Sequence, residues 1–210
     1  VQVCHRLVIA MKIALVPLDD RPCNLKFPKK IASSANVEVL TPPKEILGYF
    51  TTSGSPQKIN EWITSVINEV DAFIISADML AYGGLIASRK MMISADDALK
   101  NLEMIKNIKK IRPEMPVHLF NVIMRLSITV DSKENLVNWE NIFKLNSLSS
   151  RLKKGKRESK KLQELKKAVP EEVLGGYFKT RERNHAVNLR AIELVRDGSI
   201  DDLILSKEDC

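Results

Sequence analysis

The sequence predicts an α/β fold in which about five βα units build a parallel sheet. Five short apolar runs show almost no alternation with polar residues, a pattern typical of parallel strands that are covered on both faces. The segments between these runs repeat apolar residues with helical spacing. This alternation favours parallel strands that are joined by right-handed crossovers. The expected strands are residues 13–18, 37–40, 72–76, 117–123 and 203–205.

The helices are predicted from their periodicity and from the residues at their ends. Ser55-Pro56 suits the start of a helix that carries apolar residues from 59 to 70. Ser94 can cap a helix over 94–108, because two aspartates follow it in the first turn. Another helix is expected around 137–148.

Two further helices are expected in the long connection before the last strand. One begins near Pro170 and should be weakened or kinked by Gly175-Gly176. The other opens at Arg181 and ends near Gly198. An insertion over the sheet edge that acts as a lid or wall would explain the length of this connection. A surface segment without a functional role is equally compatible with it.

Two sheet arrangements fit the pattern, namely a partial (β/α) barrel and an open Rossmann-like sheet. Ionisable residues follow the first, third, fourth and fifth strands, which suits a barrel in which every strand feeds one ring of loops. Five strands cannot close such a barrel, and the chain ends directly after the fifth. We therefore expect a fold truncated at its C-terminus, with a complete five-stranded open sheet as the alternative.

The chain is expected to form the N-terminal part of one α/β domain over residues 11–210. Residues 1–10 precede Met11, which resembles a natural start, and are interpreted as a non-native upstream extension; a short edge strand or frayed terminus is the alternative. A basic insertion covers about residues 144–167, where ten Lys or Arg face two Glu. The net charge of +7 is therefore concentrated in one segment.

Composition argues against several classes of protein. No run of about 18 apolar residues is present, so no membrane span is expected. Cys4, Cys23 and Cys210 are scattered, which favours neither a disulfide framework nor a zinc site and makes a cytoplasmic location the default. The basic insertion lacks interleaved aromatic residues, which argues against nucleic-acid binding and favours a solvated segment. The oligomeric state is not predicted.

Charged residues gather where the expected strands end, and in parallel sheets that edge binds ligands. Two adjacent carboxylates, Asp19 and Asp20, follow the first strand, although neighbouring side chains point in roughly opposite directions. Carboxylates of this kind serve as acids, bases or ligands of hard cations, and guanidinium groups hold anionic or hydroxylated substrates. The predicted catalytic residues are Asp19, Asp20, Asp78, Glu208 and Asp209. The predicted substrate-binding residues are Arg21, Tyr82, Gly83, Gly84, Arg89, Arg125, Arg183 and Asn184.

A purely structural interpretation stands beside each of these assignments. One aspartate of the 19–20 pair could cap the next helix while Arg21 pairs with it. The Gly83-Gly84 pair could form only a tight turn, and a glycine pair alone is a weak phosphate signal. Arg125 could belong to a structural ion pair, and residues 181–185 could form a solvated helix face.

The predicted function is hydrolytic acid/base chemistry on a polyhydroxylated, sugar-like small molecule, with glycoside cleavage as the natural example. One alternative is an enzyme that uses Mg²⁺ or Mn²⁺ on a phosphate-bearing substrate. Another is a non-catalytic module that binds a sugar or an anion. Carboxylate pairs at glycosidase separation would favour the first, and three oxygens that converge on one point would favour the second.

Four motifs resemble a bacterial family known only as domain of unknown function 4127. The sequence P-L-D-x-R-P matches residues 17–22, and D-x-L-x-Y-G-G-L-x-x-S-R matches residues 78–89. A strand ending I-M-R matches residues 123–125, and R-x-R-N-H matches residues 181–185. The family usually has S-x-D-D at the last strand, where this chain reads Ser-Lys-Glu-Asp at 206–209. Because family members are longer, the resemblance implies that the chain is an N-terminal fragment, and it implies no reaction or cofactor.

Overall fold

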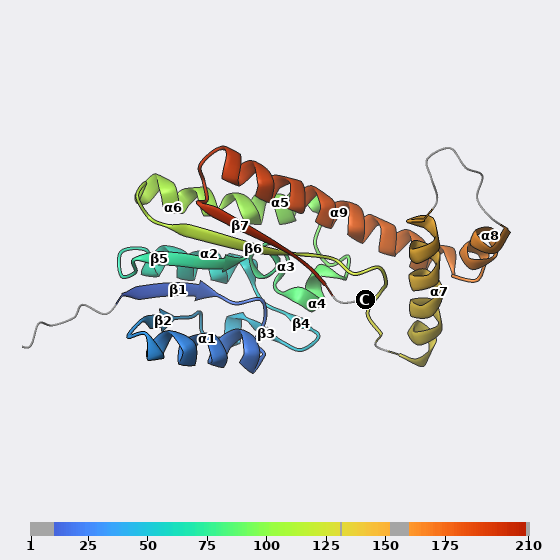
Figure 1. Cartoon of the computed structure of the whole chain (residues 1–210), viewed down its shortest axis with the longest axis horizontal. Helices are drawn as coiled ribbons and strands as arrows, with labels where there is room; N and C mark the ends of the chain where they lie inside the picture. The colour runs from blue at the N-terminus through green and yellow to red at the C-terminus, as the bar shows by residue number, and fades with distance from the viewer. Residues whose placement is uncertain (1–10, 131, 152–159, 209–210) are drawn as a thin grey trace, which may run out of the picture.

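Five parallel strands form one open sheet in the computed structural model, which describes residues 11–130, 132–151 and 160–208. The predicted α/β class with a five-stranded parallel sheet is confirmed. The strand order is β2-β1-β5-β6-β7, so that β2 and β7 lie at opposite edges and the arrangement is an open sheet, not a barrel (Figure 1). The strands are β1 (Lys12–Val16), β2 (Glu38–Leu40), β5 (Ala72–Ser76), β6 (Val117–Ile123) and β7 (Asp202–Lys207).

Nine α-helices occur in the described part of the chain, together with one short 3-10 helix (Lys44–Ile46) and one small hairpin. The antiparallel hairpin joins β3 (Gly48–Tyr49) to β4 (Thr52–Ser53) and was not predicted. The helices are α1 (Pro22–Ser34), α2 (Pro56–Val66), α3 (Ala77–Tyr82), α4 (Leu85–Ser88), α5 (Ala95–Glu103), α6 (Ile105–Ile111), α7 (Lys133–Ser149), α8 (Lys160–Lys167) and α9 (Glu171–Arg196).

The core lies where the central strands meet the helices. Ala14, Phe73, Ile75 and Leu119 come from three adjacent strands and are almost completely buried. Helix α9 packs along β6 and β7 and against α5, whereas α1 packs beside β2 (Figure 1). At the outer edge Ile204 is 66% exposed, so β7 departs from the expectation of strands covered on both faces.

Capping explains why several helices begin where the sequence predicts. The Ser55 hydroxyl accepts a hydrogen bond from the backbone N–H of Lys58 at the start of α2. Ser94 accepts one from Asp97 at the start of α5, and the acidic first turn there complements the helix dipole.

The last helix differs from the prediction. Residues 171–196 form one continuous helix through Gly175-Gly176, where a kink and then a separate helix were expected. A Cβ atom added at either glycine would meet no atom within 4 Å, so these glycines serve no close contact. Packing of the helix against β6, β7 and α5 outweighs their low helix propensity.

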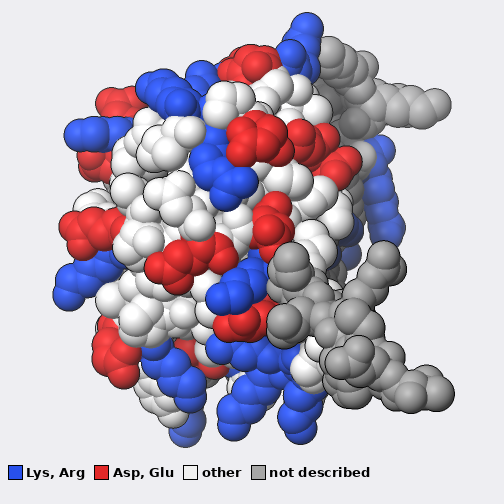
Figure 2. All heavy atoms as spheres, turned by 90° about the vertical axis from the view of Figure 1, so that its left-hand side faces the viewer, with Lys and Arg blue, Asp and Glu red and all other residues white. Residues whose placement is uncertain are grey.

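The two ends of the sheet differ in character. Where the strands begin, acidic and basic side chains are interspersed over the surface, as Figure 2 shows. Pairs such as Lys12 with Glu38 and Lys109 with Asp201 lie at this edge. At the opposite end, α7 and α8, which hold the described part of the basic insertion, lie beyond the ends of the strands (Figure 1).

None of the helices within the described ranges is both long enough and apolar enough to traverse a lipid bilayer. Residues 152–159, which belong to the basic insertion, lie outside these ranges. The same holds for residues 1–10, Asp209 and Cys210.

The glycines predict an opposed pair of stability effects. Gly83 has φ +87°, and an added Cβ would lie 2.4 Å from the carbonyl oxygen of Gly54, so Gly83→Ala should lower the free energy of unfolding by at least about 2 kcal/mol. Gly176→Ala adds a methyl group to open space in a helix and should raise the free energy of unfolding by about 0.5–1 kcal/mol. Urea unfolding of the two variants checks both signs. If Gly83→Ala left the free energy of unfolding unchanged, the close contact between Gly83 and Gly54 would be contradicted.

Candidate functional site

A cleft of about 320 Å³ opens at the carboxyl ends of β1 and β5. The chain leaves β1 toward β2 on one side and later continues through β5 to β6 on the other, so these two neighbouring strands flank a topological switch point. Open α/β sheets bind ligands in the crevice at this position. The cleft is lined by residues from three segments: 19–22 after β1, 47–53 in and before the hairpin, and 83–89 around α4.

The segment after β1 contributes two carboxylates to the cleft, Asp19 and Asp20, and they differ in their hydrogen bonds. Asp19 accepts hydrogen bonds from the Arg21 guanidinium at 2.8 Å and from the Asn24 amide at 2.6 Å. Burial raises the pKa of Asp19, but the hydrogen bonds from Arg21 and Asn24 outweigh it and hold the pKa below its usual value. This geometry matches the structural alternative for Asp19 and Arg21. Asp20 also lines the cleft, and it has no hydrogen bond or ion pair within the described ranges.

The glycine pair serves close backbone packing. Gly83 ends α3 in the left-handed region, and its carbonyl oxygen accepts a hydrogen bond from the Gly54 N–H at 2.8 Å. Gly84 has φ +121°, and a Cβ there would lie 3.4 Å from the carbonyl oxygen of Leu18. Both glycines line the cleft, as expected for ligand-binding residues, but their conformation is already required by the turn between α3 and α4.

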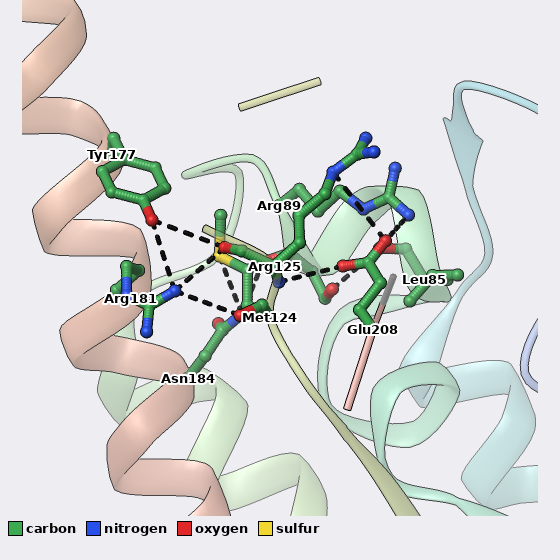
Figure 3. A network of polar contacts seen from close by, with 9 residues as sticks. Leu85, Arg89, Met124, Arg125, Tyr177, Arg181, Asn184 and Glu208 are labelled. Carbon is green, nitrogen blue, oxygen red and sulfur yellow. Dashed lines mark hydrogen bonds and ion pairs between the residues drawn. The ribbon is translucent and has the colours of Figure 1, made fainter. Parts of the chain in front are cut away.

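Glu208 brings together two of the predicted arginines. Its buried carboxylate forms an ion pair with Arg89 and lies 3.9 Å from the Arg125 Nε, as Figure 3 shows. It also accepts a hydrogen bond from the Arg125 backbone N–H at 3.2 Å. Arg89 also lines the cleft, whereas Arg125 is not part of the lining. Three predicted site residues, Arg89, Arg125 and Glu208, therefore meet at this edge, although the expected partner of Arg125 was Asp19, Asp20 or Asp78.

Helix α9 fixes the loop that carries Arg89. The Arg183 guanidinium donates hydrogen bonds to the carbonyl oxygens of Lys90 at 2.9 Å and Ile93 at 3.1 Å. It also donates one to the Ser88 carbonyl oxygen. The Asn184 amide donates to the Ser88 carbonyl oxygen at 2.8 Å. Both side chains are buried and neither belongs to the cleft lining, and their donors hold the loop.

A second set of contacts from α9 fixes the loop that carries Arg125. Arg181 donates to the carbonyl oxygens of Met124 at 3.0 Å and Arg125 at 2.9 Å (Figure 3). The Tyr177 hydroxyl lies 3.4 Å from the same Arg125 oxygen. Tyr177 was not predicted, because its role depends on a loop about 50 residues away in the chain.

Asp78 and Tyr82 are buried residues of α3 that do not belong to the cleft lining. Tyr82 is buried, with the Arg183 guanidinium 4.5 Å above the centre of its ring. Asp78 is 1% exposed, and its Oδ2 accepts a hydrogen bond from the Val122 N–H at 3.0 Å. Within the described residues its Oδ1 has no hydrogen-bond partner, since the nearby Ser88 hydroxyl donates to the Leu85 carbonyl oxygen. Burial raises the pKa of the Asp78 carboxyl to about 7, although the hydrogen bond from the Val122 N–H and the positive charge of Arg89 act in the opposite direction.

The carboxylates do not form a metal site in the part of the chain that the structure describes. No three His, Cys, Asp or Glu side chains gather there at a spacing that could hold an ion. Asp19 is paired with Arg21, Asp78 is enclosed in the protein, and Glu208 is paired with arginines. Asp209, the remaining predicted catalytic residue, lies outside the described ranges.

The raised pKa of Asp78 predicts a pH-dependent stability. Its ordinary value is 3.8 and its folded value about 7, so between these pH values the folded chain holds a proton that the unfolded chain has released. The stability contributed by this group therefore falls as pH rises through that window, by about 4 kcal/mol in all. Asp78→Asn cannot lose a proton, so its stability relative to the unsubstituted chain should increase from pH 4 to pH 8. Chemical unfolding across this range checks the trend. If the unfolding free energies of the two proteins changed in parallel with pH, the raised pKa of Asp78 would be contradicted.

The shared carboxylate predicts a large cost for removing its charge. Glu208→Gln preserves size but leaves the Arg89 and Arg125 guanidinium groups without this counter-charge, so we expect a loss of about 3 kcal/mol in unfolding free energy. Glu61→Gln, at an exposed position on α2, is the matched control and should stay within about 0.5 kcal/mol. A loss at Glu208 no larger than the control would show that the cluster does not stabilise this edge.

Comparison with protein families gives one match, which covers residues 13–210 and is described as Protein of unknown function (DUF4127). Comparison with curated proteins and with solved structures finds no match. The family match spans nearly the whole sequence and includes all four motifs that suggested the resemblance. The chain belongs to the DUF4127 family.

Proposed function

We propose that the cleft binds a small polyhydroxylated molecule through an anionic group, and that the protein hydrolyses such a substrate with Asp20 as the proton-transferring residue. The observation that carries this proposal is the composition of the cleft at the switch point. A guanidinium held by buried contacts and a carboxylate without an ion pair among the described residues line the same cavity.

Arg89 supports recognition of an anion. The Arg89 guanidinium lines the cleft, and its ion pair with the buried Glu208 carboxylate holds it there. Helix α9 fixes the backbone on either side of Arg89, so little conformational freedom is lost when a ligand binds. A planar guanidinium suits carboxylate and phosphate groups, which accept two parallel hydrogen bonds.

Asp20 supports both hydroxyl binding and proton transfer. An ionised carboxylate accepts hydrogen bonds from substrate hydroxyl groups and can remove a proton from water. The usual glycosidase arrangement needs a second carboxylate across the scissile bond. Asp19 is not free for that role while Arg21 and Asn24 hold it. Hydrolysis with one residue as the base is therefore the form of the reaction that this cleft supports best.

A binding measurement with charge-matched variants tests the anion site. Glucose 6-phosphate and glucuronate should bind the unsubstituted protein in calorimetry, and neutral glucose should bind at least about tenfold more weakly. Arg89→Lys keeps the charge but loses the planar fork, so the affinity for both anions should fall about tenfold. Lys110→Ala removes one exposed positive charge on α6 and should have no more than about a twofold effect.

The reaction is tested separately from binding. Asp20→Asn keeps an oxygen that accepts hydrogen bonds from substrate hydroxyl groups, so the anions should still bind, while any hydrolysis of phosphorylated or acidic glycosides falls at least about a hundredfold because the amide cannot take up a proton. The assay is run with and without Mg²⁺ and Mn²⁺, because Asp20 is also the carboxylate that a cation in the cleft would meet. Binding without turnover under every condition would replace the enzyme by a non-catalytic anion-binding module. No binding of either anion would overturn the proposed site.

A further inference from the structure

Two aromatic side chains form an exposed wall at the mouth of the cleft. Tyr49 and Phe50 lie at the tip of the β3–β4 hairpin, and they are 76% and 72% exposed. Both line the cavity that also contains Asp20 and Arg89. Large aromatic rings are usually buried, so two adjacent exposed rings beside charged groups need a physical reason.

The base of this hairpin is held by close backbone contacts. A Cβ at Gly48 would lie 2.3 Å from the carbonyl oxygen of Thr52, and one at Gly54 would lie 2.8 Å from that of Ile46. Gly54 in turn packs on Gly83 and donates a hydrogen bond to it at 2.8 Å. Gly48 therefore lets the hairpin close tightly, and Gly54 and Gly83 let its base sit against the turn after α3. The rings project from a fixed base.

The backbone at Phe50 is strained without a compensating gain in packing. Phe50 has φ +49°, in the left-handed region that bulky residues rarely adopt. Glycine or asparagine would fit this turn at a lower conformational cost. The ring itself is exposed, so the protein does not recover the cost by burying it. Strain that persists beside a cleft is typical of ligand-binding positions.

We propose that Tyr49 and Phe50 stack on the apolar face of a sugar ring whose anionic substituent binds Arg89. This inference rests on the proposed function and narrows its substrate class from polyhydroxylated anions in general to ring-form sugars with a phosphate or carboxylate. One face of such a ring presents mainly C–H groups, which pack on aromatic rings, while its hydroxyl groups reach Asp20. A cavity of about 320 Å³ suits one or two sugar units and is too small for a folded partner.

The test compares a ring sugar with an open-chain molecule that carries the same charged group. Glucose 6-phosphate and glycerol 3-phosphate both offer a phosphate and hydroxyl groups, but only the first offers a ring. Tyr49→Ala and Phe50→Ala should weaken glucose 6-phosphate binding about fivefold to tenfold in calorimetry and change glycerol 3-phosphate binding less than twofold. Phe27→Ala, which removes an aromatic ring 55% exposed on α1 and outside the cleft lining, should leave both affinities unchanged.

Phe50→Asn provides a second, independent readout. Asparagine tolerates the left-handed conformation, so this variant should unfold at a higher temperature than the unsubstituted protein while still losing affinity for the ring sugar. Greater stability together with weaker binding would separate a functional ring from a merely structural one.

The outcomes distinguish the two proposals. Equal affinities for glucose 6-phosphate in the unsubstituted protein and both hairpin variants would overturn the stacking role while leaving the anion site intact. Equal losses for the ring and open-chain molecules would also overturn it, because the hairpin would then act only on the phosphate. Failure of the unsubstituted protein to bind either molecule would overturn the anion site, and with it the stacking role.

Discussion

The carboxylate of Glu208 is the contact on which the candidate site depends most. It lies at the end of β7, and its partners Arg89 and Arg125 follow α4 and β6, so three distant parts of the chain meet at one buried ion cluster. A buried ion cluster is favourable only when its geometry is good and its remaining donors and acceptors are satisfied. The hydrogen bond from the Arg125 N–H to Glu208 adds such a partner from the backbone itself.

Helix α9 supplies the geometry that this cluster requires. Arg183 and Asn184 bind carbonyl oxygens around Arg89, and Arg181 binds the carbonyl oxygens of Met124 and Arg125. The polar motif at 181–184 therefore acts through the backbone of two loops. Residues that bind carbonyl oxygens in this way carry the same side chains as residues that bind ligands, so the sequence pattern alone does not separate the two roles.

Strands were predictable from the sequence because each one is a local, continuous pattern. The limits of β5 and β6 agree with the predicted ranges 72–76 and 117–123. The β3–β4 hairpin was missed because two-residue strands leave no periodicity to detect. Asp78 follows a strand as predicted, but its burial was not predicted: α3 begins at Ala77, and the carboxylate accepts a hydrogen bond from the Val122 N–H of β6. Such placements depend on tertiary packing between segments, which a local pattern does not contain.

The two walls of the cleft are made rigid by different means. On one side, glycines at 48, 54 and 83 allow backbone segments to touch, and the hairpin follows from that contact. On the other side, long side chains from α9 reach carbonyl oxygens and hold Arg89 in place. A site whose walls are both fixed loses little entropy when a ligand binds, so its selectivity follows from shape and charge. The Asp20 carboxylate, which has no ion pair among the described residues, lines the same cleft as the two exposed aromatic rings and the Arg89 guanidinium, and this set of groups suits a molecule with one apolar face and one negative end.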